Sequence, residues 1–149
     1  MIRKLIVDNE VIAQQMLGVQ IPSYQVEAEL IGFYDIPQLK DTVQTLMSSN
    51  ETCVGYFVME ELAAFISYTD EGKFIDICRL VVHPDHFRKG IAKKLVAHVI
   101  DVIANNKKVI VSTGAKNTPA KQLYKQFGFQ EMKNIEVAPD LFITLLERN

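Results

Sequence analysis

Apolar residues in the first fifty positions recur at helical spacing, with interruptions. A weak alternation over residues 3–7 predicts a short strand, and Asn9 is a suitable cap for a helix whose apolar face runs from Val11 to Val19. Pro22 interrupts that pattern, so we expect an irregular or bent helical connection over residues 23–37. A second helix is expected after this connection, and its buried face is predicted to carry Leu39, Val43, Leu46 and Met47.

The period changes at Thr52, where β-forming residues begin to dominate. The runs TCVGYFVM and LAAFISYT are separated by Glu60 and Glu61, a spacing that predicts a tight hairpin. Residues 74–82 form a third run that is apolar on both faces, which indicates a strand in the centre of a sheet.

Helices and strands alternate in the second half. Gly90 begins a long amphipathic helix, and the run KVIVST after it predicts a buried strand. Thr118 and Pro119 are a strong helix start, and Gly128 ends that helix. Two final strands are expected over residues 129–137 and 141–146.

This order predicts one domain over residues 1–149, of the α/β class in its α+β form. Three adjacent strands in the first half require antiparallel pairing, whereas the helix near Gly90 requires a parallel crossover. We therefore expect a mixed, mostly antiparallel central sheet of about six to seven strands, flanked by about four helices.

Composition and charge narrow the function classes. The 149 residues carry 16 basic and 18 acidic side chains, a net charge of −2, which argues against nucleic acid as the main partner. Cys53 and Cys78 lie in apolar runs and are expected to be reduced thiols, which favours the cytoplasm. No window resembles a secretion signal or a membrane span, so we expect neither export nor membrane insertion.

The segment DICRLVVHPDHFRKGIAKKL has the pattern of an anion site. A central strand leads through a short loop into a helix, where backbone N–H groups and the helix dipole attract negative charge. Gly90 allows a phosphate to approach the main chain, with Arg88, Lys89, Lys93 and Lys94 around it. An ordinary strand-to-helix turn with solvated lysines is the alternative.

Two motifs resemble the GNAT (general N-acetyltransferase) superfamily. Phe87-Arg88-Lys89-Gly90-Ile91-Ala92 is similar to its acyl-CoA loop [QR]-x-x-G-x-[GA], with Phe87 in place of Gln or Arg. We expect Phe87 to pack onto the core. The segment NTPAKQLYKQFGF, residues 117–129, resembles the family's N-x-x-A-x-x-L-Y-x-x-x-G-F motif.

The resemblance implies acetyl transfer from acetyl-CoA directly to a primary amine of a small molecule or peptide, through a ternary complex. In such enzymes the residue matching Tyr124 protonates the leaving thiolate, although an aromatic side chain that only packs in the core is the alternative. The residue matching Asn117 contacts pantetheine, although a simple capping role is the alternative. The resemblance places the cosubstrate against Leu80, Val81, Val82, Arg88, Lys89, Gly90, Ile91, Ala92, Lys93, Asn117, Ala120 and Tyr124.

A base is needed to deprotonate the amine, and Asp76 is the leading candidate. Several family members carry a catalytic Glu in this strand, and a carboxylate in an apolar run is costly unless it is solvated or paired. A salt bridge with Arg79 is the alternative. The resemblance also puts residues 23–37 over the acceptor site, where acidic groups would favour a cationic amine; the polar residues there include Tyr24, Glu27, Glu29, Tyr34 and Asp35.

Other readings stay open. A catalytically silent CoA-binding sensor or interaction module, or an acyltransferase for a longer acyl-CoA, would carry the same motifs. The C-terminal strands could support a homodimer. His83 and His86 lack further ligands at suitable spacing, so we expect no metal.

Overall fold

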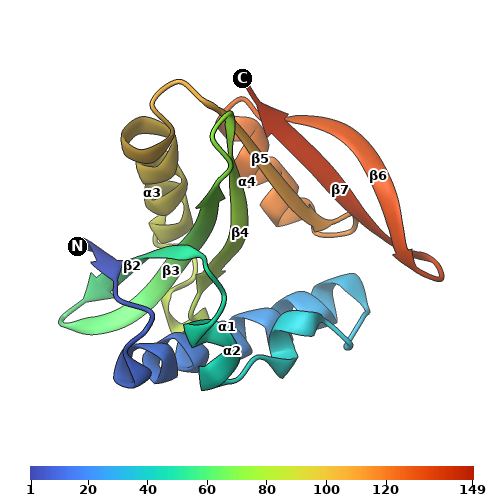
Figure 1. Cartoon of the computed structure of the whole chain (residues 1–149). Helices are drawn as coiled ribbons and strands as arrows, with labels where there is room; N and C mark the ends of the chain where they lie inside the picture. The colour runs from blue at the N-terminus through green and yellow to red at the C-terminus, as the bar shows by residue number, and fades with distance from the viewer.

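The computed structural model describes residues 1–149 and contains a seven-stranded sheet in the order β1-β2-β3-β4-β5-β7-β6 (Figure 1). Neighbouring strands are antiparallel except β4 and β5, which are parallel. This confirms the predicted mixed, mostly antiparallel sheet. The strands are β1 (Ile2–Leu5), β2 (Thr52–Val58), β3 (Glu61–Asp70), β4 (Phe74–Val82), β5 (Lys108–Gly114), β6 (Gln130–Ala138) and β7 (Leu141–Arg148).

Four α-helices flank this sheet, as expected. They are α1 (Glu10–Ile31), α2 (Val43–Met47), α3 (Ile91–His98) and α4 (Thr118–Gln126). Two short 3₁₀ helices, η1 (Pro37–Lys40) and η2 (Pro84–His86), precede α2 and α3, and α3 continues as a π-helix, η3 (Val99–Ala104). No helix is both long enough and apolar enough to cross a bilayer.

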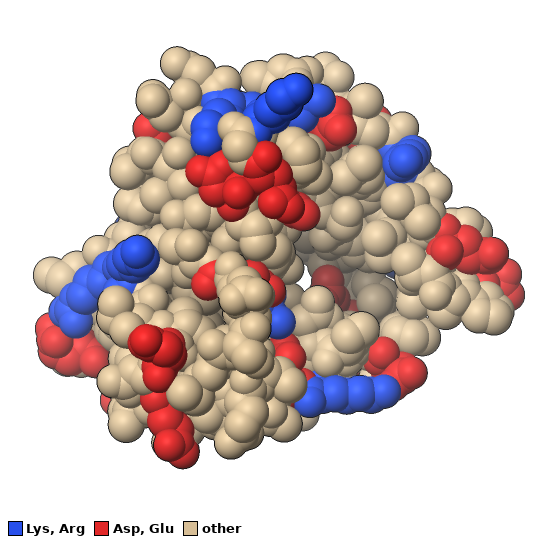
Figure 2. Space-filling model, in the orientation of Figure 1, with Lys and Arg blue, Asp and Glu red and all other residues tan.

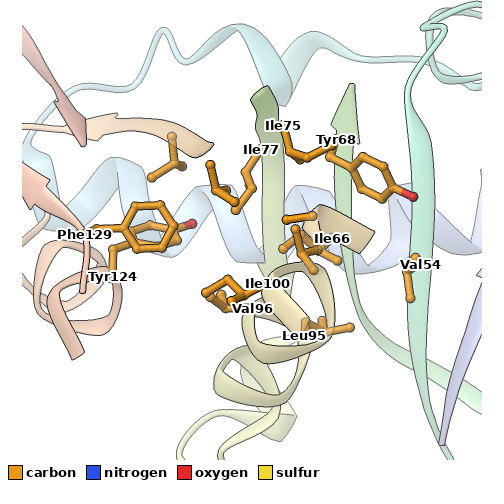
Figure 3. Close-up of a cluster of buried hydrophobic side chains, with 14 of the residues drawn as sticks. Val54, Ile66, Tyr68, Ile75, Ile77, Leu95, Val96, Ile100, Tyr124 and Phe129 are labelled. Carbon is orange, nitrogen blue, oxygen red and sulfur yellow. The ribbon is translucent and has the colours of Figure 1, made fainter. Parts of the chain in front are cut away.

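The helices divide between the two faces of the sheet. Successive strand residues point to opposite faces, so Phe65 and Ile66 of β3 belong to different cores. Phe65 packs with α1, which lies with α2 below the sheet in Figure 1. The core around Ile66 contains α3 and α4 and is drawn in Figure 3; its labelled members include Ile75, Ile77, Leu95, Val96, Ile100, Tyr124 and Phe129.

Helix α1 corrects the expectation of an irregular connection after Pro22. The helix runs through Pro22 without a break and ends at Ile31, where Gly32 has a φ of 70° and donates its N–H to the carbonyl of Ala28. Pro22 removes one backbone donor, but Ala28 and Ile31 beyond it remain buried against the protein. Packing of this second half therefore outweighs the lost hydrogen bond, and residues 23–31 are held as regular helix.

Two smaller expectations about buried side chains are wrong. Met47 is 36% exposed, because α2 is only five residues long and buries Leu46 instead. Phe87 is 40% exposed, because it lies in the loop after η2 and not on a core-facing element. Both cysteines are free thiols, as expected.

Strand β4 has partners on both sides along only part of its length. It pairs with β5 from Phe74 to Ile77, whereas its pairing with β3 continues to Val82. The β3–β4 register shifts between Ser67 and Tyr68, which is a local irregularity of the kind that bends strands. From Cys78 onward the edge of β4 that faces β5 is consequently free of a neighbouring strand.

Candidate active site

The loop between β4 and α3 presents a run of backbone N–H groups without acceptors in the protein. None of the amides from Arg88 to Lys93 donates a hydrogen bond to the backbone or to a side chain. Arg88 and Gly90 have φ values of 64° and 74°, and a Cβ on Gly90 would meet no atom within 4 Å. A ligand can therefore approach the main chain here, and the arrangement suits a phosphate.

Basic side chains surround this loop unevenly. Arg88, Lys89 and Lys93 are exposed beside it, and the Lys89 Nζ lies 3.3 Å from Nδ1 of His86. Lys94 points elsewhere, because its Nζ donates to the Tyr56 hydroxyl at 3.2 Å. Of the four basic residues predicted around an anion, Arg88 and Lys93 thus have no partner within the protein, whereas Lys89 contacts His86. No group of three or more His, Cys, Asp or Glu side chains is arranged to hold a metal ion.

The predicted main-chain contacts on β4 lie along its free edge. Leu80, Val81 and Val82 pair with Ile66, Phe65 and Ala64 of β3, and no strand lies on their other side. Backbone groups that point away from β3 are available to a ligand there, next to the loop that carries the unpaired amides.

Asn117 lies at the start of α4 and makes two fixed contacts. Its side-chain oxygen accepts the N–H of Ala120 at 3.2 Å, so Asn117 caps the helix, and the expected cap Thr118 is instead the first helical residue. Its amide nitrogen donates to Oε1 of Glu27 on α1 at 2.7 Å. The capping interpretation of Asn117 is therefore correct, and contact with a pantetheine arm stays a prediction. Ala120 is half-buried against the core.

Tyr124 is 3% exposed and packs against Phe129, with ring centroids 5.3 Å apart (Figure 3). Its hydroxyl makes no hydrogen bond within the protein. Burial raises the pKa of this hydroxyl far above its usual value, and the charge of Glu27 raises it further. Tyr124 therefore holds its proton at physiological pH, as a proton donor must.

Glu27 and Tyr24, one turn apart on α1, share this environment. Burial raises the pKa of the half-buried Glu27 carboxyl, while the hydrogen bond from Asn117 opposes that shift. Burial and the charge of Glu27 both raise the pKa of Tyr24. Sequence reasoning had placed Glu27 in a group of polar residues near the acceptor; its contact with Asn117 was not foreseen, because nothing local links two residues so far apart.

Asp76 lies at the paired end of β4, opposite Thr69 and Ile110. It is half-buried and makes no side-chain hydrogen bond or ion pair. Burial raises the pKa of its carboxyl, and the charges of Glu71 and Glu51 add to this effect. The pKa of Asp76 thus responds to Glu71 and Glu51, whereas the pKa of Tyr124 responds to Glu27.

Arg79 does not pair with Asp76, so the alternative interpretation of Asp76 is wrong. Its guanidinium donates to Oε1 of Glu51 at 2.5 Å and to Oδ2 of Asp41 at 3.2 Å, and its side chain is only 12% exposed. Gln20 on α1 also donates to Asp41, at 2.7 Å. These buried contacts tie the helical layer to β2 and β4.

Figure 2 shows a hollow between the helical layer at the bottom of the view and the strands above it, with acidic side chains visible inside. A small cavity of about 40 Å³ lies where α1 and β5 end. The cavity is lined by Ile31 of α1, Gly114 of β5 and Phe142 of β7. Ile31 lies one helical turn after Glu27.

A profile of the acetyltransferase (GNAT) family matches residues 15–129. UPF0157 protein YqkA of Bacillus subtilis (strain 168) is 43% identical over 134 residues, which are 90% of this chain and only 39% of that protein. The chain thus spans about two fifths of the length of this curated relative.

Solved structures share the fold. The ribosomal-protein-S18-alanine N-acetyltransferase of Escherichia coli has a TM-score of 0.79 and 16% identity, covering 99% of this chain and 91% of its own. The PaiA N-acetyltransferase of Thermoplasma acidophilum, solved in complex with coenzyme A, has a TM-score of 0.74 and 18% identity, covering 97% and 96%.

Proposed function

Because this chain belongs to the acetyltransferase (GNAT) family, we propose that it transfers an acetyl group from acetyl-CoA directly to a primary amine in a ternary complex. The observation that carries the proposal is the run of unpaired backbone amides from Arg88 to Lys93. Coenzyme A in the Thermoplasma structure supports a CoA ligand for a fold of this kind. The chain spans 39% of the length of YqkA. The acetyltransferase activity is therefore proposed for this chain and, as part of the same proposal, for any longer protein that contains it.

In this proposal the loop binds the pyrophosphate. The amides of Gly90, Ile91 and Ala92 donate to its oxygens, and Arg88, Lys89 and Lys93 supply positive charge. The pantetheine arm continues along the free edge of β4, against the backbone of residues 80–82, toward Asn117 and Ala120. One of the β4 amides then stabilises the negative charge that develops on the thioester oxygen.

Two side-chain roles complete the reaction. Tyr124 protonates the leaving thiolate, a role supported by its hydroxyl, which has no partner within the protein and is protonated at physiological pH. A carboxylate accepts the proton of the amine. The sequence favours Asp76 for this role, and Glu27 is a second candidate because it is half-buried near Tyr124. We further propose that residues 1–149 form a single domain, active without metal.

The test measures CoA release from acetyl-CoA with polyamines, amino acids, aminoglycosides and peptides as acceptors, with reactions lacking the acceptor as the control. Release that depends on an amine supports the proposal. Tight acetyl-CoA binding with no release across the panel contradicts it and favours a CoA-binding sensor. Faster release from octanoyl-CoA than from acetyl-CoA instead identifies an acyltransferase for longer chains.

A further inference from the structure

Glu27 differs from the other half-buried acidic groups near the helical layer, Asp41 and Glu51, in having no cation beside it. Asp41 and Glu51, which are similarly shielded from water, both bind Arg79. Glu27 is half-buried, yet no Lys or Arg lies within ion-pair distance of its carboxylate. A partly desolvated carboxylate without a counter-charge is unfavourable, and a cationic ligand would relieve that cost.

The hydrogen bond from Asn117 fixes how this carboxylate is presented. Oε1 of Glu27 accepts from the Asn117 amide at 2.7 Å, and Oε2 has no partner in the protein. The Asn117 amide cannot turn away, because its own oxygen caps α4 through the N–H of Ala120. One oxygen of Glu27 is thus held and the other is free to bind a ligand.

The titratable groups that face Glu27 are two tyrosines, Tyr24 on the same helix and Tyr124 on α4. Both phenols are neutral at physiological pH, and burial raises their pKa values further, so neither adds a second negative charge beside Glu27. Asp76 responds to Glu71 and Glu51 and not to this group. Of the two half-buried carboxylates without an ion pair, Glu27 and Asp76, Glu27 is therefore the one that shares its surroundings with Tyr124.

We propose that Glu27 binds the acceptor as a primary ammonium ion and removes its proton, an assignment that rests on the acetyltransferase function proposed above. The ammonium gives one proton to the Glu27 carboxylate, and the freed nitrogen lone pair forms the C–N bond with the thioester carbon. The C–S bond then breaks. The second nitrogen proton reaches the thiolate sulfur through the Tyr124 hydroxyl, and Glu27 releases its proton to water.

The surface next to Glu27 defines the remainder of the acceptor. Ile31 is one turn further along the same face of α1 and, with Phe142, lines the small cavity of about 40 Å³. Lys116 and Asp140 line the same cavity, which is therefore apolar only in part. The substrate class is a small primary amine that is bound as its ammonium ion.

The deciding variant is Glu27→Gln, which keeps an oxygen for Asn117 and removes the charge. At pH 7 we expect kcat/KM for the amine to fall about 100-fold or more, with acetyl-CoA affinity unchanged. The loss should shrink as the pH rises toward the amine pKa, because deprotonated amine then needs no base. Glu10→Gln, at an exposed position in the first turn of the same helix, is the matched control and should retain full activity.

The assignment is overturned if Glu27→Gln has a normal kcat/KM, or if its loss of kcat/KM does not depend on pH. It is also overturned if Asp76→Asn shows the expected pH-dependent loss and Glu27→Gln does not. A wild-type protein that fails with every amine defeats the proposed function instead. A measurement without turnover still decides about Glu27. Its carboxyl ¹³C resonance should move when propylamine is added to the CoA complex and should not move with 1-propanol; an unmoved resonance overturns the assignment.

Discussion

Asn117 and Glu27 lie 90 positions apart in the sequence and are joined by a hydrogen bond of 2.7 Å between α4 and α1. These helices cover opposite faces of the sheet. The same Asn117 side chain caps α4. One amide therefore links the helix that carries Tyr124 to the helix that carries the proposed amine-binding carboxylate.

Asn117→Asp should expose the importance of this link. Aspartate still caps α4, but it cannot donate to Glu27 and places a second negative charge beside it. We expect unfolding free energy to fall by about 1–3 kcal/mol at pH 7 and to recover in acid, where one carboxyl is protonated. Urea denaturation at pH 7 and pH 4 measures this change.

The double variant Glu27→Gln with Asn117→Asp is the control, because the Gln amide can donate to the new carboxylate. Most of the lost stability should return. If the change in unfolding free energy of the double variant equals the sum of the changes in the two single variants, the hydrogen bond has no energetic role.

Glu27→Gln by itself should make the protein more stable at neutral pH. Burial raises the pKa of this carboxyl above its ordinary value of 4.5, so ionised Glu27 disfavours the folded state. This penalty is absent at pH values below the pKa of Glu27 in the unfolded chain. It grows as the pH rises and is complete above the pKa of Glu27 in the folded protein. In thermal melts from pH 4 to pH 8, the melting temperature of the variant should therefore increase relative to that of the wild type as the pH rises. Equal melting temperatures at every pH would contradict this.

Gly90→Ala should weaken binding of acetyl-CoA more than 10-fold with a modest loss of stability. The added Cβ strains a residue at φ 74° by about 1 kcal/mol and projects into the open space over the unpaired amides. Isothermal titration measures the affinity. Gly72→Ala carries the same backbone strain at φ 85° in a remote turn and should bind acetyl-CoA normally.

Tyr124→Phe should lower kcat by about 100-fold with little change in acetyl-CoA affinity. Its hydroxyl makes no internal hydrogen bond, so folding should be unaffected. Steady-state kinetics with the best amine of the panel provides the measurement, and Tyr68→Phe, which removes another buried phenol hydroxyl, on β3, is the control. Unchanged kcat would exclude Tyr124 as the acid.

Arg79→Met should destabilise the fold by about 3–5 kcal/mol, because Asp41 and Glu51 would remain shielded from water without a cation. Denaturant unfolding measures the loss. Lys107→Met removes a cation from the exposed pair with Asp70 and should have little effect. Similar effects of both substitutions would contradict a special role for the buried pairs.

Local signals in the sequence were sufficient for most of the fold. The apolar run over residues 74–82 coincides with β4, and the helix start at Gly90 and the stop at Gly128 are both found. These features depend on neighbouring residues alone: strand period, helix caps and glycine at positive φ. The order of elements then fixed the mixed sheet.

Features that depend on contacts between distant residues were not predictable. Pro22 indicated a break that the packing of Ala28 and Ile31 overrides. A salt bridge between Arg79 and Asp76 was the alternative considered, whereas the partners of Arg79, Asp41 and Glu51, come from elsewhere in the chain. Glu27 could be placed near the acceptor only as one of several polar residues, since its distinguishing contact comes from α4.

The short pairing of β4 with β5 also affects how the protein moves. Residues 74–77 and 108–111 provide the only ladder between a half-sheet of β1 to β4 and a half-sheet of β5 to β7. Few backbone hydrogen bonds must break for this seam to loosen, so its amides should be less protected from exchange than the centre of either half. A ligand that lies against β4 and reaches α4 would clamp the halves together and turn two weakly joined units into one cooperative body.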